Sequence, residues 1–215
     1  MSSRPQTEEE LQKREAIGVI RASRFVRKYA HSHQAISVAT ICEIHKEIFK
    51  EAWPEIAGKY REENLKITHS RHLPPHFSEV PRLMTQRDEE LNEKLKMLKI
   101  TEGIIGGKHN NDEVLVESLE SVVQLAAWLH HAITFVHPFR EGNGRTARLS
   151  ANLILERYGL VGISVKIEKE NKNRYRQALA QIDSMNDYEP LVGLIYDGLL
   201  ERYEGVPLKY YSVKK

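Results

Sequence analysis

The sequence has one cysteine, Cys42, among 215 residues, so no disulfide can form within the chain. It also lacks a charge excess, because 32 basic and 30 acidic residues leave a net charge of only +2. No apolar run is long enough to cross a bilayer, and the first residues lack the apolar stretch of a secretory signal. The expectation is therefore a cytoplasmic protein with neither a nucleic-acid partner nor a membrane partner.

Strand-like alternation is almost absent too, whereas apolar residues recur every three or four positions along most of the chain. This spacing predicts helices over about 8–30, 37–49, 78–99, 114–135, 145–158, 168–184 and 188–203. In the proline-containing stretch 54–77, Leu65 to Thr68 is the one strand candidate and suggests a small hairpin. We predict an all-α fold with one small β-hairpin, in a single domain over 1–215, because a chain of this length has room for one core.

The segment from His137 to Arg148, with the sequence HPFREGNGRTAR, concentrates residues that suit phosphate chemistry. Gly142, Asn143 and Gly144 tolerate positive φ, so main-chain N–H groups can approach an anion closely, and the asparagine adds an amide donor. The helix that starts near Arg145 presents its unpaired N–H groups and its dipole to the same loop. Arg145 and Arg148 stand three residues apart, so we expect both on one face, gripping a polyphosphate.

Two further side chains of this segment suggest the reaction. A carboxylate beside bound phosphates is suited to hold Mg²⁺, which assigns Glu141 to the metal. An imidazole can take a proton near neutral pH, so His137 is a natural general base for an attacking hydroxyl. Each of these features is commonly structural when it occurs alone. Their combination within twelve residues favours in-line attack on a nucleotide phosphorus, catalysed by positioning and charge neutralisation.

The same segment resembles the signature of the Fic family, His-x-Phe-x-(Asp/Glu)-Gly-Asn-Gly-Arg-x-x-Arg, at every specified position. Residues 57–61, 65–70 and 74–76 are similar to the family's entry to its β-hairpin flap, and residues 173–183 resemble the helix that borders its nucleoside pocket. The resemblance covers about residues 15–200. It implies an all-α Fic core whose one small hairpin is the flap.

The resemblance implies a protein adenylyltransferase, which transfers AMP from ATP to a Ser, Thr or Tyr hydroxyl of a target protein and releases pyrophosphate. His137 would deprotonate that hydroxyl, Phe139 would fix the loop by packing, and Glu141 would bind Mg²⁺. The phosphates would be bound by Gly142, Asn143, Gly144, Arg145 and Arg148, the nucleoside by Tyr175 and Asp183, and the target's main chain, as an added strand, by the flap residues Ile67, Thr68 and His69.

Four alternatives stay open at this point. A Fic-fold transferase could use GTP or UTP, since the motif reads phosphates and not bases, or could transfer phosphocholine. The Doc kinase branch carries Lys where Gly144 stands, which argues against phosphoryl transfer. A catalytically silent interaction module has no need of His137 beside an intact anion hole. The balanced charge disfavours a nucleic-acid-binding helical protein.

Many Fic proteins carry an inhibitory helix with the pattern Ser/Thr-x-x-x-Glu-Gly/Asn, whose glutamate pairs with the second arginine of the motif. Outside the motif itself, the Glu-Gly and Glu-Asn pairs of this chain begin at Glu63, Glu102, Glu170 and Glu204, and none of these glutamates has Ser or Thr four residues before it. We therefore expect Arg148 to be free within the chain. Any inhibition would then come from a separate, antitoxin-like protein that supplies the glutamate.

Overall fold

A computed structural model describes residues 4–68, 70, 72–98, 112–163 and 169–204. These residues form seven α-helices and a short 3₁₀ turn, η1; their bounds are α1 Glu8–Ala30, α2 Val38–Phe49, η1 Phe77–Glu79, α3 Val80–Met97, α4 Asp112–Val136, α5 Asn143–Arg157, α6 Lys169–Met185 and α7 Glu189–Glu204. The helices fall where the periodicity predicts them, to within a few residues at each end. The all-α fold class is confirmed.

Short polar residues set several helix starts. Thr7 is the N-cap of α1 and accepts a hydrogen bond from the Glu10 N–H at 3.3 Å, and Ser37, the first residue of the predicted range 37–49, is the N-cap of α2. The third helix begins later than the predicted start at residue 78. Ser78 lies inside η1, and α3 begins two residues later with a proline in its first turn, where the missing N–H costs nothing.

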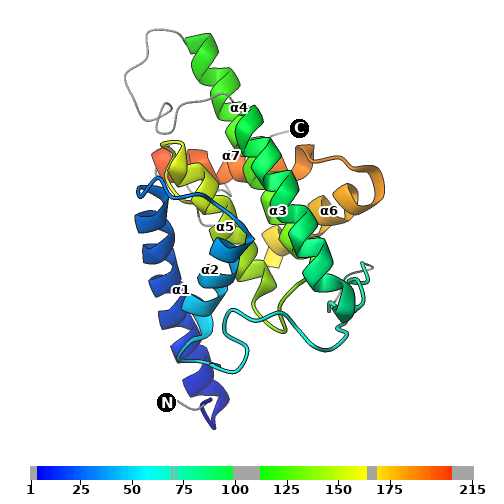
Figure 1. Ribbon diagram of the computed structural model, residues 1–215. Helices are drawn as coiled ribbons and strands as arrows, with labels where there is room; N and C mark the ends of the chain where they lie inside the picture. Colours follow the sequence, from blue (N-terminus) through cyan, green and yellow to red (C-terminus); the bar gives the residue numbers. More distant parts are fainter. Residues whose placement is uncertain (1–3, 69, 71, 99–111, 164–168, 205–215) are drawn as a thin grey trace.

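Helix α5 lies at the centre of the fold and packs against α1, α2 and α4 (Figure 1). Its position follows from its composition, because Ala147, Leu153 and Ile154 are fully buried. Helices α1 and α2 approach very closely at Gly18, where an added Cβ would lie 1.9 Å from the Ile48 carbonyl oxygen. Helix α4 connects this centre to α3, α6 and α7.

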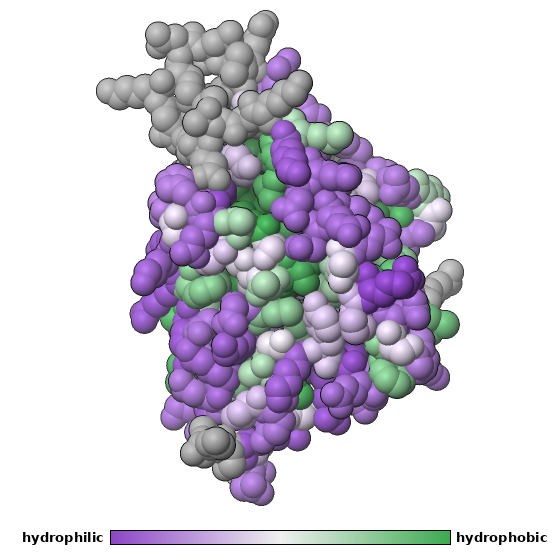
Figure 2. Space-filling view, viewed as in Figure 1, coloured by the Kyte–Doolittle hydropathy of each residue, from purple (hydrophilic) through white to green (hydrophobic). Residues whose placement is uncertain are grey.

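The distribution of hydrophilic and hydrophobic residues on the surface agrees with the amphipathic patterns that predict the helices. The face shown in Figure 2 is largely hydrophilic at its margins, with hydrophobic residues gathered along its middle. Within the described ranges, no helix combines the length and the apolar character needed to cross a bilayer.

The strand predicted at Leu65–Thr68 is not found. Leu65 to Ile67 have no regular structure, and Thr68 lies in a turn in which the Ser70 N–H donates to the Ile67 carbonyl at 3.2 Å. A strand requires a second segment to pair with its main chain, and no strand occurs in the part of the chain that the structure describes. His69, the third predicted flap residue, lies outside the described residues.

Candidate active site

The candidate base His137 directly follows Val136, the last residue of α4. Its N–H still donates to the Ile133 carbonyl at 2.9 Å, but its φ is +51°, in the left-handed region that helix ends usually fill with glycine. Pro138 supplies the reason for the stop, because proline disfavours the helical region for the residue before it. The sequence therefore places the imidazole at a sharp turn between a helix and a loop.

The hydrogen bonding of the His137 ring determines which nitrogen can accept a proton. Nδ1 lies 3.3 Å from the Thr134 carbonyl, which can only accept, so Nδ1 carries the hydrogen and Nε2 is bare. Burial lowers the pKa of His137, and the nearby Arg61 guanidinium and His72 lower it further, against the opposing effect of the Thr134 carbonyl. The ring is neutral near pH 7, which is the state that a general base requires.

Arg61 is only 4% exposed and holds the turn at His137 in place. Its Nε donates to the His137 carbonyl at 2.8 Å, and its main-chain N–H donates to the Pro138 carbonyl at 2.8 Å. Its two remaining nitrogens donate to the carbonyls of Glu63 at 2.9 Å and Pro75 at 2.6 Å. One buried guanidinium thus ties the loop after α4 to both ends of the 61–77 segment.

His45 of α2 supports the same loop through a second set of contacts. Its Nδ1 accepts from the Gly58 N–H at 2.9 Å, so its Nε2 carries the hydrogen and donates to the Glu141 carbonyl at 3.1 Å. Its ring stacks on Phe139, with centroids 3.9 Å apart and planes 7° from parallel. Burial lowers the pKa of His45 to about 4, so it acts as a neutral support. Phe139 is fully buried.

The Asn143 side chain is buried and bonded to Phe139 on both sides. Its Oδ1 accepts from the Phe139 N–H at 2.9 Å, and its Nδ2 donates to the Phe139 carbonyl at 2.7 Å. The amide that the sequence suggests as an anion donor is therefore engaged within the loop, because a buried amide must satisfy both of its groups. What Asn143 offers an anion is its main-chain N–H at the start of α5, where no intrahelical acceptor exists.

Gly142 is the N-cap of α5 and has a φ of +75°. A Cβ at this position would lie 2.3 Å from the Phe49 ring, so both the backbone and the packing require glycine. At Gly144 a Cβ would meet only the Arg148 Nη1, at 3.4 Å. The two glycines thus differ: one is needed to build the loop, and the other keeps space open next to an arginine.

Glu141 is exposed, with its Oε1 accepting from the Gly142 N–H at 2.9 Å and lying 3.4 Å from the Arg145 Nη2. The other end of the Arg145 guanidinium pairs with Glu15 of α1 at 2.5 Å, and the group lies 5.0 Å from the Phe49 ring centroid. Arg145 is thus turned toward α1. Sequence reasoning had no means of finding Glu15, which is 130 residues away.

The residues around Glu141 fit Mg²⁺ in one specific way. Among the described residues, no group of three His, Cys, Asp or Glu side chains could hold a metal ion. Magnesium is commonly bound by one or two carboxylates together with substrate phosphates and water. One exposed carboxylate beside the start of a helix therefore suits a cation that arrives with bound phosphates.

Arg148 and Arg145 have different partners, although both were expected to lie on one face and bind the same polyphosphate. Its guanidinium is largely buried between Gly144 and Tyr175 of α6, and it hydrogen-bonds the Tyr175 hydroxyl oxygen. In the part of the chain that the structure describes, no carboxylate forms an ion pair with Arg148. The two arginines are held by α1 and α6, respectively.

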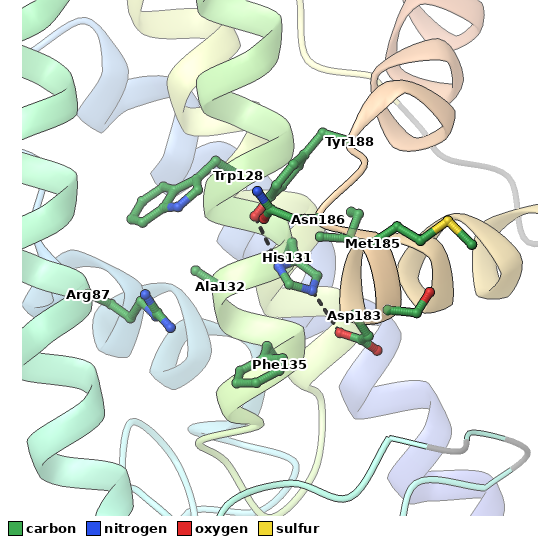
Figure 3. A pocket seen from close by; sticks show the side chains of 11 residues that line it. Arg87, Trp128, His131, Ala132, Phe135, Asp183, Met185, Asn186 and Tyr188 are labelled. Carbon is green, nitrogen blue, oxygen red and sulfur yellow. Dashed lines mark hydrogen bonds and ion pairs between the residues drawn. The ribbon is translucent and has the colours of Figure 1, made fainter.

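Asp183 lies at a cavity of about 490 Å³ between α3, α4 and the end of α6. Figure 3 shows His131 at its centre: the ring Nε2 lies 2.9 Å from Asp183, and the ring Nδ1 lies 3.2 Å from the Tyr188 hydroxyl. Phe135, two residues before the candidate base, also lines the cavity. Tyr175, which the sequence grouped with Asp183, lies outside this cavity.

Comparison with known proteins identifies the family to which this site belongs. The model of the Fic/DOC family matches residues 35–155, from the loop before α2 to near the end of α5. The chain belongs to the Fic/DOC family. It is 27% identical over 188 residues to the protein adenylyltransferase Fic of Nematostella vectensis, covering 86% of this Fic chain and 38% of that protein. It is also 27% identical over 184 residues to the Aedes aegypti protein of the same name, covering 85% of this chain and 32% of that protein. The chain therefore spans about a third of the length of these relatives.

Solved Fic structures share the fold. Fic-1 from C. elegans superimposes with a TM-score of 0.61 at 25% identity, covering 95% of this chain and 54% of that one. The Bartonella tribocorum effector BepC with bound AMPPNP has a TM-score of 0.61 over 90% of this chain and 88% of its own, and at 18% identity this likeness is one of fold. The resemblance inferred from residues 137–148 is confirmed.

Three residues that build the Fic site were missed as site residues by sequence reasoning: Arg61, His45 and Glu15. His45 carried a signal, since it lies on the apolar face of α2 beside Ile44 and Ile48, and a histidine on a buried face needs hydrogen-bond partners. Arg61 lies in the 57–61 segment that resembles the family's flap entry, but nothing local indicates that it binds the turn at His137, and Glu15 carried no signal. Each is an ordinary charged residue in a charged stretch, and only the packing shows what it contacts.

Proposed function

We propose that this Fic domain is a protein adenylyltransferase, with ATP as the co-substrate and a hydroxyl side chain of another protein as the acceptor. The observation that carries the proposal is His137, a neutral imidazole with a bare Nε2 held next to the start of α5. A proton acceptor beside an anion-binding helix start is the arrangement that hydroxyl attack on a phosphorus requires. The names of the Nematostella and Aedes relatives support the same activity.

In the proposed reaction, the target hydroxyl gives its proton to the His137 Nε2 while its oxygen attacks the α-phosphorus of ATP. The bond between the α-phosphorus and the bridging oxygen breaks, and pyrophosphate leaves with that oxygen. The main-chain N–H groups of residues 143–145 bind the phosphate oxygens, and Arg148 serves the pyrophosphate side. The chain contributes mainly position and charge, which is the usual catalytic strategy for this chemistry.

Glu141 would hold Mg²⁺ together with the phosphates. The ion would supply neutralisation of phosphate charge when bound. The contact of Glu141 with Arg145 keeps the carboxylate at the loop before the nucleotide arrives.

We place the nucleoside in the cavity that Asp183 lines. Its volume of about 490 Å³ falls in the range of small-molecule sites, and its wall includes the aromatic side chains of Trp128, Phe135 and Tyr188. Because Phe135 is two residues from His137, a nucleoside there would have its phosphates near the base. A different nucleotide, such as GTP or UTP, or a phosphocholine donor is the alternative that this placement leaves to experiment.

The target protein would lie along the loop that includes Ile67, Thr68 and His69, with its main chain added as a strand. Residues 65–68 belong to no sheet, so main-chain groups of this stretch that lack a partner strand can pair with a new one. A separate antitoxin-like protein that contacts Arg148 remains our proposal for inhibition. Labelling by the purified chain that rises when Glu15 is changed to Gln would contradict it, because the inhibitory group would then belong to the chain.

The proposed activity can be tested with ATP labelled at either the α- or the γ-phosphorus, incubated with the protein in a cell lysate. We expect label transfer to protein from the α position only, and loss of transfer in His137→Ala. His31→Ala, at the exposed end of α1, serves as the matched histidine control and should label normally. Unlabelled GTP, UTP and CDP-choline as competitors separate the alternative donors. Transfer from the γ position alone would establish a kinase and refute the proposal.

A further inference from the structure

Three polar residues from three helices meet at one place: His130 of α4, which is buried, and Arg148 of α5 and Tyr175 of α6, which are partly buried. The Tyr175 hydroxyl lies 3.3 Å from the His130 Nε2, and the two rings meet edge to face with centroids 5.5 Å apart. The Arg148 guanidinium hydrogen-bonds the same hydroxyl. None of these contacts can be read from the sequence, since the three residues are far apart in it.

The donors and acceptors in this cluster favour one arrangement of hydrogen bonds. A guanidinium has N–H donors and no acceptor, so the Tyr175 oxygen accepts from Arg148 and cannot donate to it. Donation of the tyrosine proton to an unprotonated His130 Nε2 satisfies the hydroxyl, whereas the other His130 tautomer would leave the hydroxyl hydrogen without a partner. His130 carries its hydrogen on Nδ1, a buried atom for which the described part of the chain offers no partner.

Tyr175, which bonds Arg148, and His130, which bonds Tyr175, are both neutral. Burial, with the Arg148 charge adding to it, lowers the pKa of His130 to about 3, and burial raises the pKa of Tyr175 to about 12. Arg145 is different, because two carboxylates, Glu15 and Glu141, lie against it. The positive charge of Arg148 is thus fixed in place without being neutralised, so it stays available to an anion from outside.

We propose that Tyr175 and His130 are positioning residues, which orient Arg148 so that its guanidinium stays beside Gly144 and binds the pyrophosphate end of a nucleoside triphosphate. The Arg148 Nη1 lies 3.4 Å from where a Gly144 Cβ would be, which puts it at the start of α5. The inference rests on the proposed nucleotide site and deepens it. It also gives Tyr175 a role other than contact with the nucleoside.

Binding of AMPPNP and of AMP, each with Mg²⁺ and measured by calorimetry on the whole chain, tests this inference. Tyr175→Phe should weaken AMPPNP binding about tenfold, the effect of losing one hydrogen bond that involves a charged group, and should leave AMP binding within about twofold. His130→Leu should behave in the same way, whereas His130→Gln, which keeps an acceptor near the Nε2 position, should restore most of the affinity. In an Arg148→Ala background, Tyr175→Phe should have no further effect.

Tyr29→Phe is the matched control, since it removes another tyrosine hydroxyl, one that donates to the Ala35 carbonyl at 2.6 Å at the end of α1. Its binding of both nucleotides should equal that of wild type. AMPPNP affinity that is unchanged in Tyr175→Phe would overturn the inference, and parallel weakening of AMP would make Tyr175 a nucleoside contact instead. If Tyr175→Phe does not fold, the difference between His130→Leu and His130→Gln decides. Failure of wild type to bind AMPPNP would overturn the proposed function, and this inference with it.

Discussion

Replacing Arg61 with alanine should both destabilise the fold and disable His137. The substitution leaves three partly buried main-chain carbonyl oxygens, those of His137, Glu63 and Pro75, without their charged donor. Hydrogen bonds of this kind contribute about 1.5 kcal/mol or more each, so we expect the free energy of unfolding to fall by about 3–5 kcal/mol. Urea denaturation followed by circular dichroism measures this change.

The effect on labelling has a separate cause. His137 is held at a positive φ that costs about 1 kcal/mol, and without the Arg61 bond to its carbonyl the turn can relax. A shift of about 1 Å in a catalytic group costs roughly 100-fold in rate, which is the loss we expect per folded molecule. Arg82→Ala, which removes an exposed ion pair with Glu79, is the control and should change stability by less than about 1 kcal/mol. An Arg61→Ala protein that loses stability but labels at the wild-type rate would refute the positioning argument.

Three further predictions follow from the loop. Gly142→Ala should lower the free energy of unfolding by about 2–4 kcal/mol, because the added Cβ meets Phe49 and the residue has a positive φ. Gly144→Ala should melt near the wild-type temperature but label more slowly. Equal melting temperatures of the two variants would contradict the conclusion that only Gly142 is needed to build the loop. The rate of labelling should fall with decreasing pH only below about 6.5, because the pKa of His137 is lowered and the neutral ring is the active form. A pH–rate profile whose acid limb is centred above about 6.5 would exclude His137 as the general base. Glu141→Gln should raise the Mg²⁺ concentration needed for half-maximal labelling, and an unchanged metal titration would show that the carboxylate is not the ligand.

The two motif arginines, Arg145 and Arg148, have different partners, so their substitution should have different effects. Arg145 already has two carboxylate partners, so its removal should alter the contact between α1 and α5 as well as the nucleotide site. Arg148 has uncharged partners, so its removal should act mainly on phosphate binding. Loss of activity in an Arg145 variant is therefore interpretable only alongside its melting temperature.

The sequence by itself determined the elements and the chemistry of the loop. Helix positions follow from apolar spacing, which is a local property, and the end of α4 follows from the histidine that precedes Pro138. Gly142 and the residues beside it predict an anion-binding helix start from backbone freedom alone. The hairpin could not be settled in this way, because a strand depends on a pairing partner that no local pattern reveals.

Tertiary structure decided which groups hold the loop and where each arginine turns. Arg61 and His137 are 76 residues apart, and Glu15 and Arg145 are 130 apart, so their contacts exist only once the helices have packed. Packing also separated Tyr175 from Asp183, which the sequence grouped together on one helix, and set the first beside Arg148 and the second at the cavity. The sequence specifies which donors and acceptors are available locally, but burial decides which of them must pair.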